Sequence, residues 1–185
     1  MNALLPDSQR TAYHEAGHAT IGRVLTLKCG GATIKPNLKE MTAGKTITFD
    51  ENDCDTAWRE RGKWRPEKSL WRGRIIAFMA GAEAEIEFFG HCDGRDGHDR
   101  NQIALMAEEL PAGIDWHTRE PRLRAMTRML VRRHRTRIER VAQALLTHRS
   151  LSAKNLDRLV GRSVADVKVN APDWWLAKYG KTLKT

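Results

Sequence analysis

The fold is decided by residues 11–27, which read TAYHEAGHATIGRVLTL. Small and aliphatic residues recur along this stretch at the spacing of an α-helix, and Asp7 or Ser8 can cap its start. His14 and His18 are four residues apart. Residues at this spacing lie on one face of a helix, one turn apart along its axis. The stretch therefore predicts a helix that carries two imidazoles side by side.

His14, Glu15 and His18 form the pattern H-E-x-x-H. In this pattern the two histidines bind one zinc ion and the glutamate projects beside them. Zinc lowers the pKa of a bound water to about 7, and a neighbouring carboxylate can take its proton as it attacks a polarised carbonyl. Three fixed positions also occur by chance, on a helix whose histidines are only solvated or packed in the core. The motif favours zinc chemistry and leaves that alternative open.

The composition is typical of a soluble globular protein, with 185 residues, of which 41% are hydrophobic and 30% charged. This length suits one domain with a real core. No apolar run approaches the roughly 20 residues of a membrane span, and the N-terminus lacks the apolar region of a signal peptide. Cys29, Cys54 and Cys92 lack the spacing of a paired metal site, so we expect reduced cysteines of a cytoplasmic protein.

The net charge of +9 is unevenly distributed, because nine arginines fall between Arg119 and Arg140. Such a stripe can bind nucleic acid, an acidic substrate or an acidic partner surface. The commoner explanation is a solvated helix face. The sequence leaves both explanations open.

The predicted fold class is mainly α with a minor β part (α+β minor), namely a helical domain with a small β-hairpin. Two short strands are expected at 32–36 and 45–49, after a glycine pair and on either side of a loop. One domain is expected over 1–185, with a core at about 7–160, a polar surface connection at 50–66 and a C-terminal tail at 161–185. Helices are expected over 67–89, 100–110, 121–148 and 152–160. The expected core positions of the later helices are Leu70, Ile75, Phe78, Met79, Ala82, Ile86, Phe89, Leu123, Met126, Leu130, Ile138, Val141 and Leu145.

A catalytic zinc site needs a third protein ligand and an open position for water. The extended pattern H-E-x-x-H-x-x-G-x-x-H is absent, since Ile21 and Val24 stand where its glycine and third histidine belong. Asp99 is one acidic candidate, at the start of a helix after a glycine-rich loop. The other candidates form a group of three glutamates on the helix expected over 67–89, namely Glu83, Glu85 and Glu87.

The sequence resembles a known family at several positions. Residues 11–19, TAYHEAGHA, look like the zinc helix of the FtsH-type ATP-dependent proteases, which are membrane-anchored AAA+ zinc metalloproteases. Residues 81–90, GAEAEIEFFG, are similar to that family's G-R-A-A-E-E-[LI]-x-[FY]-G stretch. Asp99 then falls without a gap on the family's third-ligand position, and residues 137–156 follow the family's closing helical pattern. Four landmarks in the right order cover most of residues 7–160.

The resemblance implies a zinc-dependent metallopeptidase that hydrolyses peptide bonds of unfolded polypeptides. It makes His14, His18 and Asp99 the zinc ligands and Glu15 the general base. It places Glu85 where it would orient the site from behind the ligands. By spacing alone, Glu85 remains an alternative third ligand.

The resemblance also concerns substrates and partners. The strand near 45–49, with Thr46, Ile47 and Thr48, is expected to pair with an extended substrate, or else to form a hairpin that only packs. The chain begins almost at the zinc helix, so we expect the family's membrane anchor and ATPase module to be missing. Partners would then be a polypeptide substrate and either an ATPase supplied by another chain or a homo-oligomeric ring.

Two alternatives to an enzyme follow from departures of this chain. Ala82 and Glu83 replace the family's Arg-Ala pair, and the helix after 121 is unusually rich in arginine. One alternative is a non-catalytic zinc-binding partner or regulator of a full-length ATP-dependent protease. The other is a basic nucleic-acid-binding module on a peptidase scaffold. An intact Glu15 favours the enzyme, since a purely structural zinc site does not need it.

Overall fold

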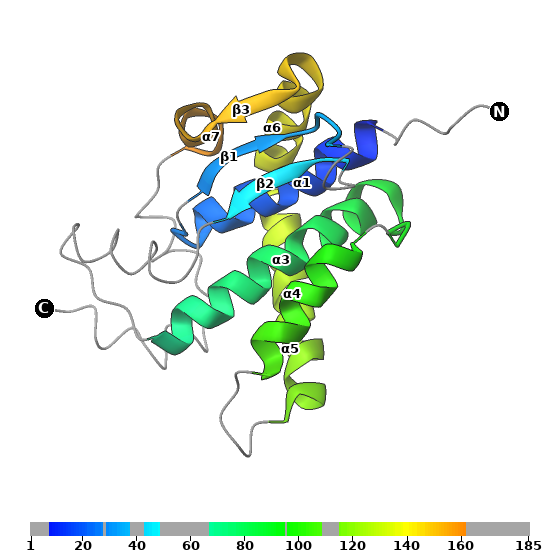
Figure 1. Cartoon of the computed structure of the whole chain (residues 1–185), viewed down its shortest axis with the longest axis vertical. Helices are drawn as coiled ribbons and strands as arrows, with labels where there is room; N and C mark the ends of the chain where they lie inside the picture. The colour runs from blue at the N-terminus through cyan, green and yellow to red at the C-terminus, as the bar shows by residue number, and fades with distance from the viewer. Residues whose placement is uncertain are drawn as a thin grey trace, which may run out of the picture.

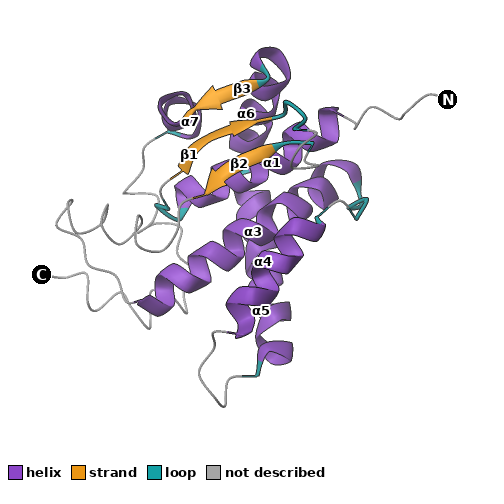
Figure 2. Ribbon diagram, in the orientation of Figure 1, coloured by secondary structure: helices purple, strands orange, loops and turns teal. Residues whose placement is uncertain are grey.

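The computed structural model describes residues 8–27, 29–37, 43–48, 67–94, 96–108 and 115–161. The predicted connection at 50–66 and the tail beyond residue 161 lie outside the described residues. The described chain is mainly helical with a small sheet, which confirms the predicted fold class (Figures 1 and 2). Its helices are α1 (Ser8–Val24), α3 (Glu67–Phe89), α4 (Gly97–Glu108), α5 (Trp116–Arg133), α6 (Arg135–His148) and α7 (Ala153–Val160).

The sheet is antiparallel and has the strand order β2-β1-β3. Its strands are β1 (Cys29–Thr33), β2 (Lys45–Thr48) and β3 (Ser150–Ser152). The predicted pairing of the first two strands is confirmed, but β1 begins before residue 32 and includes the glycine pair that we expected to precede it. A Cβ at Gly31 would lie 2.7 Å from the Leu151 carbonyl oxygen, so glycine lets β3 approach closely. The third strand was not predicted.

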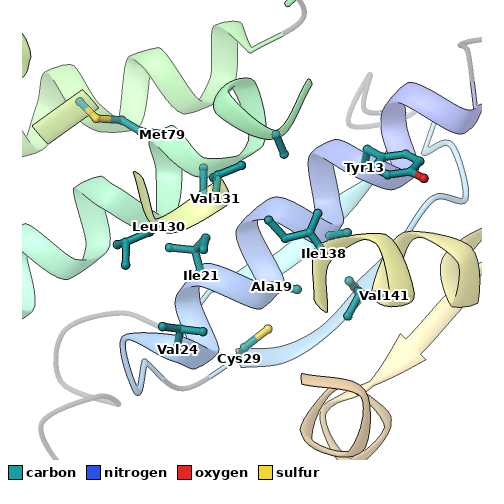
Figure 3. Close-up of a cluster of buried hydrophobic side chains, with 14 of the residues drawn as sticks. Tyr13, Ala19, Ile21, Val24, Cys29, Met79, Leu130, Val131, Ile138 and Val141 are labelled. Atoms are coloured by element: carbon teal, nitrogen blue, oxygen red, sulfur yellow. The ribbon is translucent and has the colours of Figure 1, made fainter. Parts of the chain in front are cut away.

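Helix α1 runs between the sheet and α3 (Figure 1). Its alanines Ala12, Ala16 and Ala19 are fully buried. Figure 3 shows Ala19 and Ile21 of α1 among side chains from α5 and α6, including Val131 and Ile138. The six core positions predicted for α5 and α6 are all buried, which confirms them.

On α3, the core prediction for Ile86 is wrong, because 37% of its surface is exposed, and Phe78 and Phe89 are only partly buried. The sequence neighbours of Ile86 both form pairs within the molecule, Glu85 with His14 and Glu87 with Arg132. Ile86 lies on the remaining side of α3 and is exposed to solvent.

The predicted single helix at 121–148 is in fact two helices, α5 and α6, which meet at His134. Neither glycine nor proline stands at this break, so the sequence carried no signal for it. Helix α5 also begins earlier than predicted, because the Asp115 carboxylate accepts a hydrogen bond from the His117 amide at 3.0 Å and caps it. None of the helices in the described ranges is long and apolar enough to cross a membrane.

Candidate metal centre

The two histidines of α1 lie directly against the backbone of α3, because glycines stand at the crossing of these helices. A Cβ at Gly17 would lie 2.5 Å from the Ala80 carbonyl oxygen. A Cβ at Gly81 would lie 2.5 Å from His18 Nε2 and 2.6 Å from His14 Nε2. Any side chain at either position would force the helices apart or displace the rings. The crossing thus fixes where both imidazoles lie.

Asp99, in the first turn of α4, completes a compact group of three donor atoms. Its Oδ2 lies 2.9 Å from His14 Nε2 and 3.1 Å from His18 Nε2, and the two Nε2 atoms are 2.9 Å apart. Donors bound to one tetrahedral zinc at about 2.0–2.1 Å would lie roughly 3.3 Å from one another. The observed triangle is slightly smaller, so a zinc ion would fit after a small outward movement of each donor.

Two imidazoles and one carboxylate suit zinc by their chemistry as well as by their spacing. Burial alone would lower the pKa of His14, but hydrogen bonds with Asp99 and Glu85 outweigh it and raise that pKa to about 10. The pKa of His18 is also raised, because the charge and hydrogen bond of Asp99 outweigh its burial. The pKa of Asp99 is lowered despite burial, by the charge of His18 and by hydrogen bonds from both rings. The Asp99 carboxylate therefore stabilises positive charge on the two imidazoles.

The far sides of both rings are also held in place. His14 Nδ1 lies 2.7 Å from Glu85 Oε1, and His18 Nδ1 lies 2.7 Å from the Ala77 carbonyl oxygen. Both partners accept hydrogen bonds, so each Nδ1 donates a proton to its partner while each Nε2 points to Asp99. This is the arrangement that orients histidine ligands in metal sites. Glu85 lies on the Nδ1 side of His14, outside the triangle of donors.

Arg10, which the sequence analysis did not single out, extends this arrangement. Its Nη1 donates to Glu85 Oε2 at 3.4 Å and to the His91 carbonyl oxygen at 3.1 Å. The pattern of apolar residues along α1 does not indicate that Arg10 contacts Glu85 of α3, because this contact depends on how the two helices cross.

The other two acidic candidates on α3, Glu83 and Glu87, face away from the donor triangle. Glu83 is buried and pairs with Arg128 at 3.0 Å, and Glu87 pairs with Arg132 at 3.2 Å and with Arg135 at 3.5 Å. The arginine stripe is thus partly neutralised by α3. These pairs give part of the stripe a structural role within the molecule.

Glu15, the candidate general base, is 94% removed from solvent, with 6% of its surface exposed. Its carboxylate is hydrogen-bonded to strand β2, because Thr46 Oγ1 donates to Glu15 Oε2 at 2.6 Å. Strand β2 is an edge of the sheet formed by the described strands, and its Ile47 is 49% exposed. The structure therefore brings together His14, Glu15, His18, Glu85, Asp99 and the middle of β2.

No protein-family model matches the chain. Over 108 residues, which are 57% of this chain, the sequence is 30% identical to a protein of Pelobacter propionicus described as an ATP-dependent zinc metalloprotease FtsH. The match spans only 16% of the length of that relative. The comparison supports a region related to an FtsH protease.

Proposed function

We propose that this chain is a zinc-dependent metallopeptidase that hydrolyses peptide bonds of unfolded polypeptides. The observation that carries this proposal is the triangle of His14 Nε2, His18 Nε2 and Asp99 Oδ2 on a helix that also bears Glu15. The similarity to an FtsH protease supports the same chemistry, because that relative is described as a zinc metalloprotease.

His14, His18 and Asp99 would hold the zinc ion. When bound, zinc would act as a Lewis acid that polarises the scissile carbonyl and lowers the pKa of water. Glu15 then accepts the proton of the attacking water on a carboxylate oxygen and passes it to the leaving amine. Glu85 and the Ala77 carbonyl hold the two rings so that their Nε2 atoms stay together. The burial of Glu15 limits competing solvent at the base.

The substrate would bind along strand β2. An extended peptide can add to a sheet edge through main-chain hydrogen bonds, which are independent of its side chains. The backbone of Thr46, Ile47 and Thr48 would provide those bonds, and the exposed Ile47 would contact an apolar substrate residue. A substrate that adds in this way must be extended, so unfolded or short polypeptides suit the site. An ATPase that unfolds substrates, or a ring of identical chains, is the partner that we propose for folded substrates.

The direct test compares wild type with Glu15→Gln. The amide is nearly isosteric and Glu15 is outside the donor triangle, so the variant should keep about the same zinc content. Its turnover of casein should fall roughly 10²–10⁴-fold, the usual contribution of a positioned acid–base group. Zinc content and cleavage are measured on the same samples.

Equal cleavage by wild type and Glu15→Gln would contradict the role of Glu15 and point to a contaminating protease. If fully zinc-loaded wild type cleaves none of several unfolded substrates, the enzyme proposal fails. The non-catalytic zinc-binding regulator would then become the better explanation.

A further inference from the structure

The contact between Thr46 and Glu15 has no role in the mechanism above. Thr46 Oγ1 lies 2.6 Å from Glu15 Oε2 and 3.1 Å from the backbone oxygen of Glu15. A threonine hydroxyl carries one proton, so it donates mainly along the shorter contact. A separation of this length is typical of a hydroxyl that donates to an ionised carboxylate. Oxygen Oε2 of Glu15 is therefore hydrogen-bonded to Thr46 of strand β2. Oε1 is then the oxygen that accepts the proton of the attacking water.

The turn before β2 encloses the same carboxylate from another side. A Cβ at Gly44 would lie 2.9 Å from Glu15 Oε1 and 2.7 Å from Thr11 Cγ2. Because glycine has no Cβ, the backbone at Gly44 can lie close to Glu15 without a clash at Oε1. Gly44 and Thr46 are two residues apart, so one short segment lies close to both oxygens of the carboxylate and hydrogen-bonds to one of them.

Thr46 is well suited to fix an orientation. Its β-branched side chain has few χ1 rotamers, and its backbone is held by pairing with Ala32 of β1. Successive side chains of a strand point to opposite faces. Thr46 therefore faces α1 while Ile47 faces away, in agreement with the exposure of Ile47. A glutamate side chain alone has three rotatable bonds, and a general base must be held within hydrogen-bond reach of the proton that it takes.

We propose that Thr46 is a positioning residue, whose hydroxyl fixes the orientation of the Glu15 carboxylate for proton transfer. This inference rests on the proposed peptidase function. It separates two roles within one strand: the backbone of β2 receives the substrate, and the side chain of Thr46 holds the base. The competing explanation is that Thr46 only packs β2 onto α1.

The test uses two substitutions of Thr46 and one matched control. Thr46→Val keeps the shape and removes the hydroxyl, so kcat should fall roughly 10- to 100-fold, as expected for a misplaced catalytic group. KM should change less than about twofold, because the β2 backbone is retained. Thr46→Ser keeps the hydroxyl and should restore most of kcat. Thr33→Val removes a hydroxyl on neighbouring β1 that donates to the Arg149 carbonyl at 3.1 Å, and should leave kcat unchanged.

Two further measurements do not depend on activity. Zinc content should be the same in wild type and all three variants, since none of these residues is a donor. The midpoint of thermal unfolding is measured for Thr46→Val in the wild-type background and in a Glu15→Met background. Thr46→Val should lower the midpoint more in the wild-type background, because the Glu15→Met background lacks the carboxylate that Thr46 hydrogen-bonds.

The positioning role is overturned if Thr46→Val retains wild-type kcat, or if Thr46→Ser is as slow as Thr46→Val. It is also overturned if Thr46→Val lowers the unfolding midpoint equally in both backgrounds. If zinc-loaded wild type is inactive, the proposed function fails and the positioning role of Thr46 in proton transfer fails with it. The unfolding measurements then still establish whether the Thr46–Glu15 contact exists, so the two failures can be told apart.

Discussion

Two faces of α3 put the same residue type to different uses. Glu83 and Glu87 are roughly 40° apart around the helix axis, while Glu85 lies roughly 200° from Glu83. The first two pair with arginines of α5 and α6, and Glu85 pairs with His14. Two residues of sequence thus separate a carboxylate that holds helices together from one that orients an imidazole. The role of each glutamate is set by what packs on its side of the helix.

The same contrast applies to glycines of α3. Gly81 lies under both imidazoles, where no Cβ fits, whereas a Cβ at Gly73 would lie 3.6 Å from a methyl group of Leu27, which is ordinary contact. One glycine is required by the candidate metal centre and the other is not. The difference between the two faces can be tested by comparing matched pairs of substitutions.

The largest effect should come from removing donors on the metal face. His18→Ala and Asp99→Ala should each lose zinc and peptidase activity together, since two remaining donors bind zinc poorly. Glu87→Ala, on the opposite face, should keep both. The measurement is zinc content after dialysis, with casein cleavage on the same samples. Retention of a full zinc content by Asp99→Ala would contradict its role as the third ligand.

The next effect concerns Gly81. Gly81→Ala should displace the rings of His14 and His18, reduce zinc content and destabilise the fold by about 1–3 kcal/mol, as overpacking usually does. Gly73→Ala is the control and should keep wild-type zinc content, because the space beside it is adequate. Denaturant unfolding and zinc analysis check both variants. Equal zinc content in Gly81→Ala and wild type would show that the crossing tolerates a methyl group.

A smaller effect is expected for Glu85. Glu85→Gln keeps the shape of the side chain and removes the charge that holds His14 Nδ1, so zinc affinity should fall roughly 10- to 100-fold. Glu87→Gln makes the same chemical change on the other face and should leave zinc affinity unchanged. Competition with a zinc chelator measures both. A complete loss of zinc in Glu85→Gln, with Asp99→Ala unaffected, would instead make Glu85 the ligand.

The smallest effect is expected on the face that carries the arginines. Arg128→Met removes the partner of the buried Glu83 but keeps most of the apolar stem. Arg128 is half-exposed, so water can replace part of the lost bond, and the cost should be about 1 kcal/mol of stability. Zinc content and casein cleavage should not change. A loss of zinc in Arg128→Met would show that the two faces of α3 are coupled.

The sequence predicted the elements whose signal is local. The spacing of His14 and His18 predicted the helical pair, and the apolar pattern predicted α3 with the bounds that the structure has. The resemblance to a family was needed for Asp99, because its position beside the histidines depends on how α4 packs. Strand β3 is three residues long, too short to give a periodic signal. The contact of Thr46 with Glu15 depends on sheet placement, which no spacing along the chain encodes.

The central claim is that His14, His18 and Asp99 hold one zinc ion. A crystal structure of the zinc-loaded chain, with anomalous diffraction recorded at the zinc edge, tests it most directly. We predict one peak per chain, about 2.0–2.2 Å from His14 Nε2, His18 Nε2 and the Asp99 carboxylate, with Glu15 beside the peak but not bound to it. A peak bound by the histidines and by Glu83 or Glu85, with Asp99 turned away, would contradict the assignment of Asp99 as the third ligand.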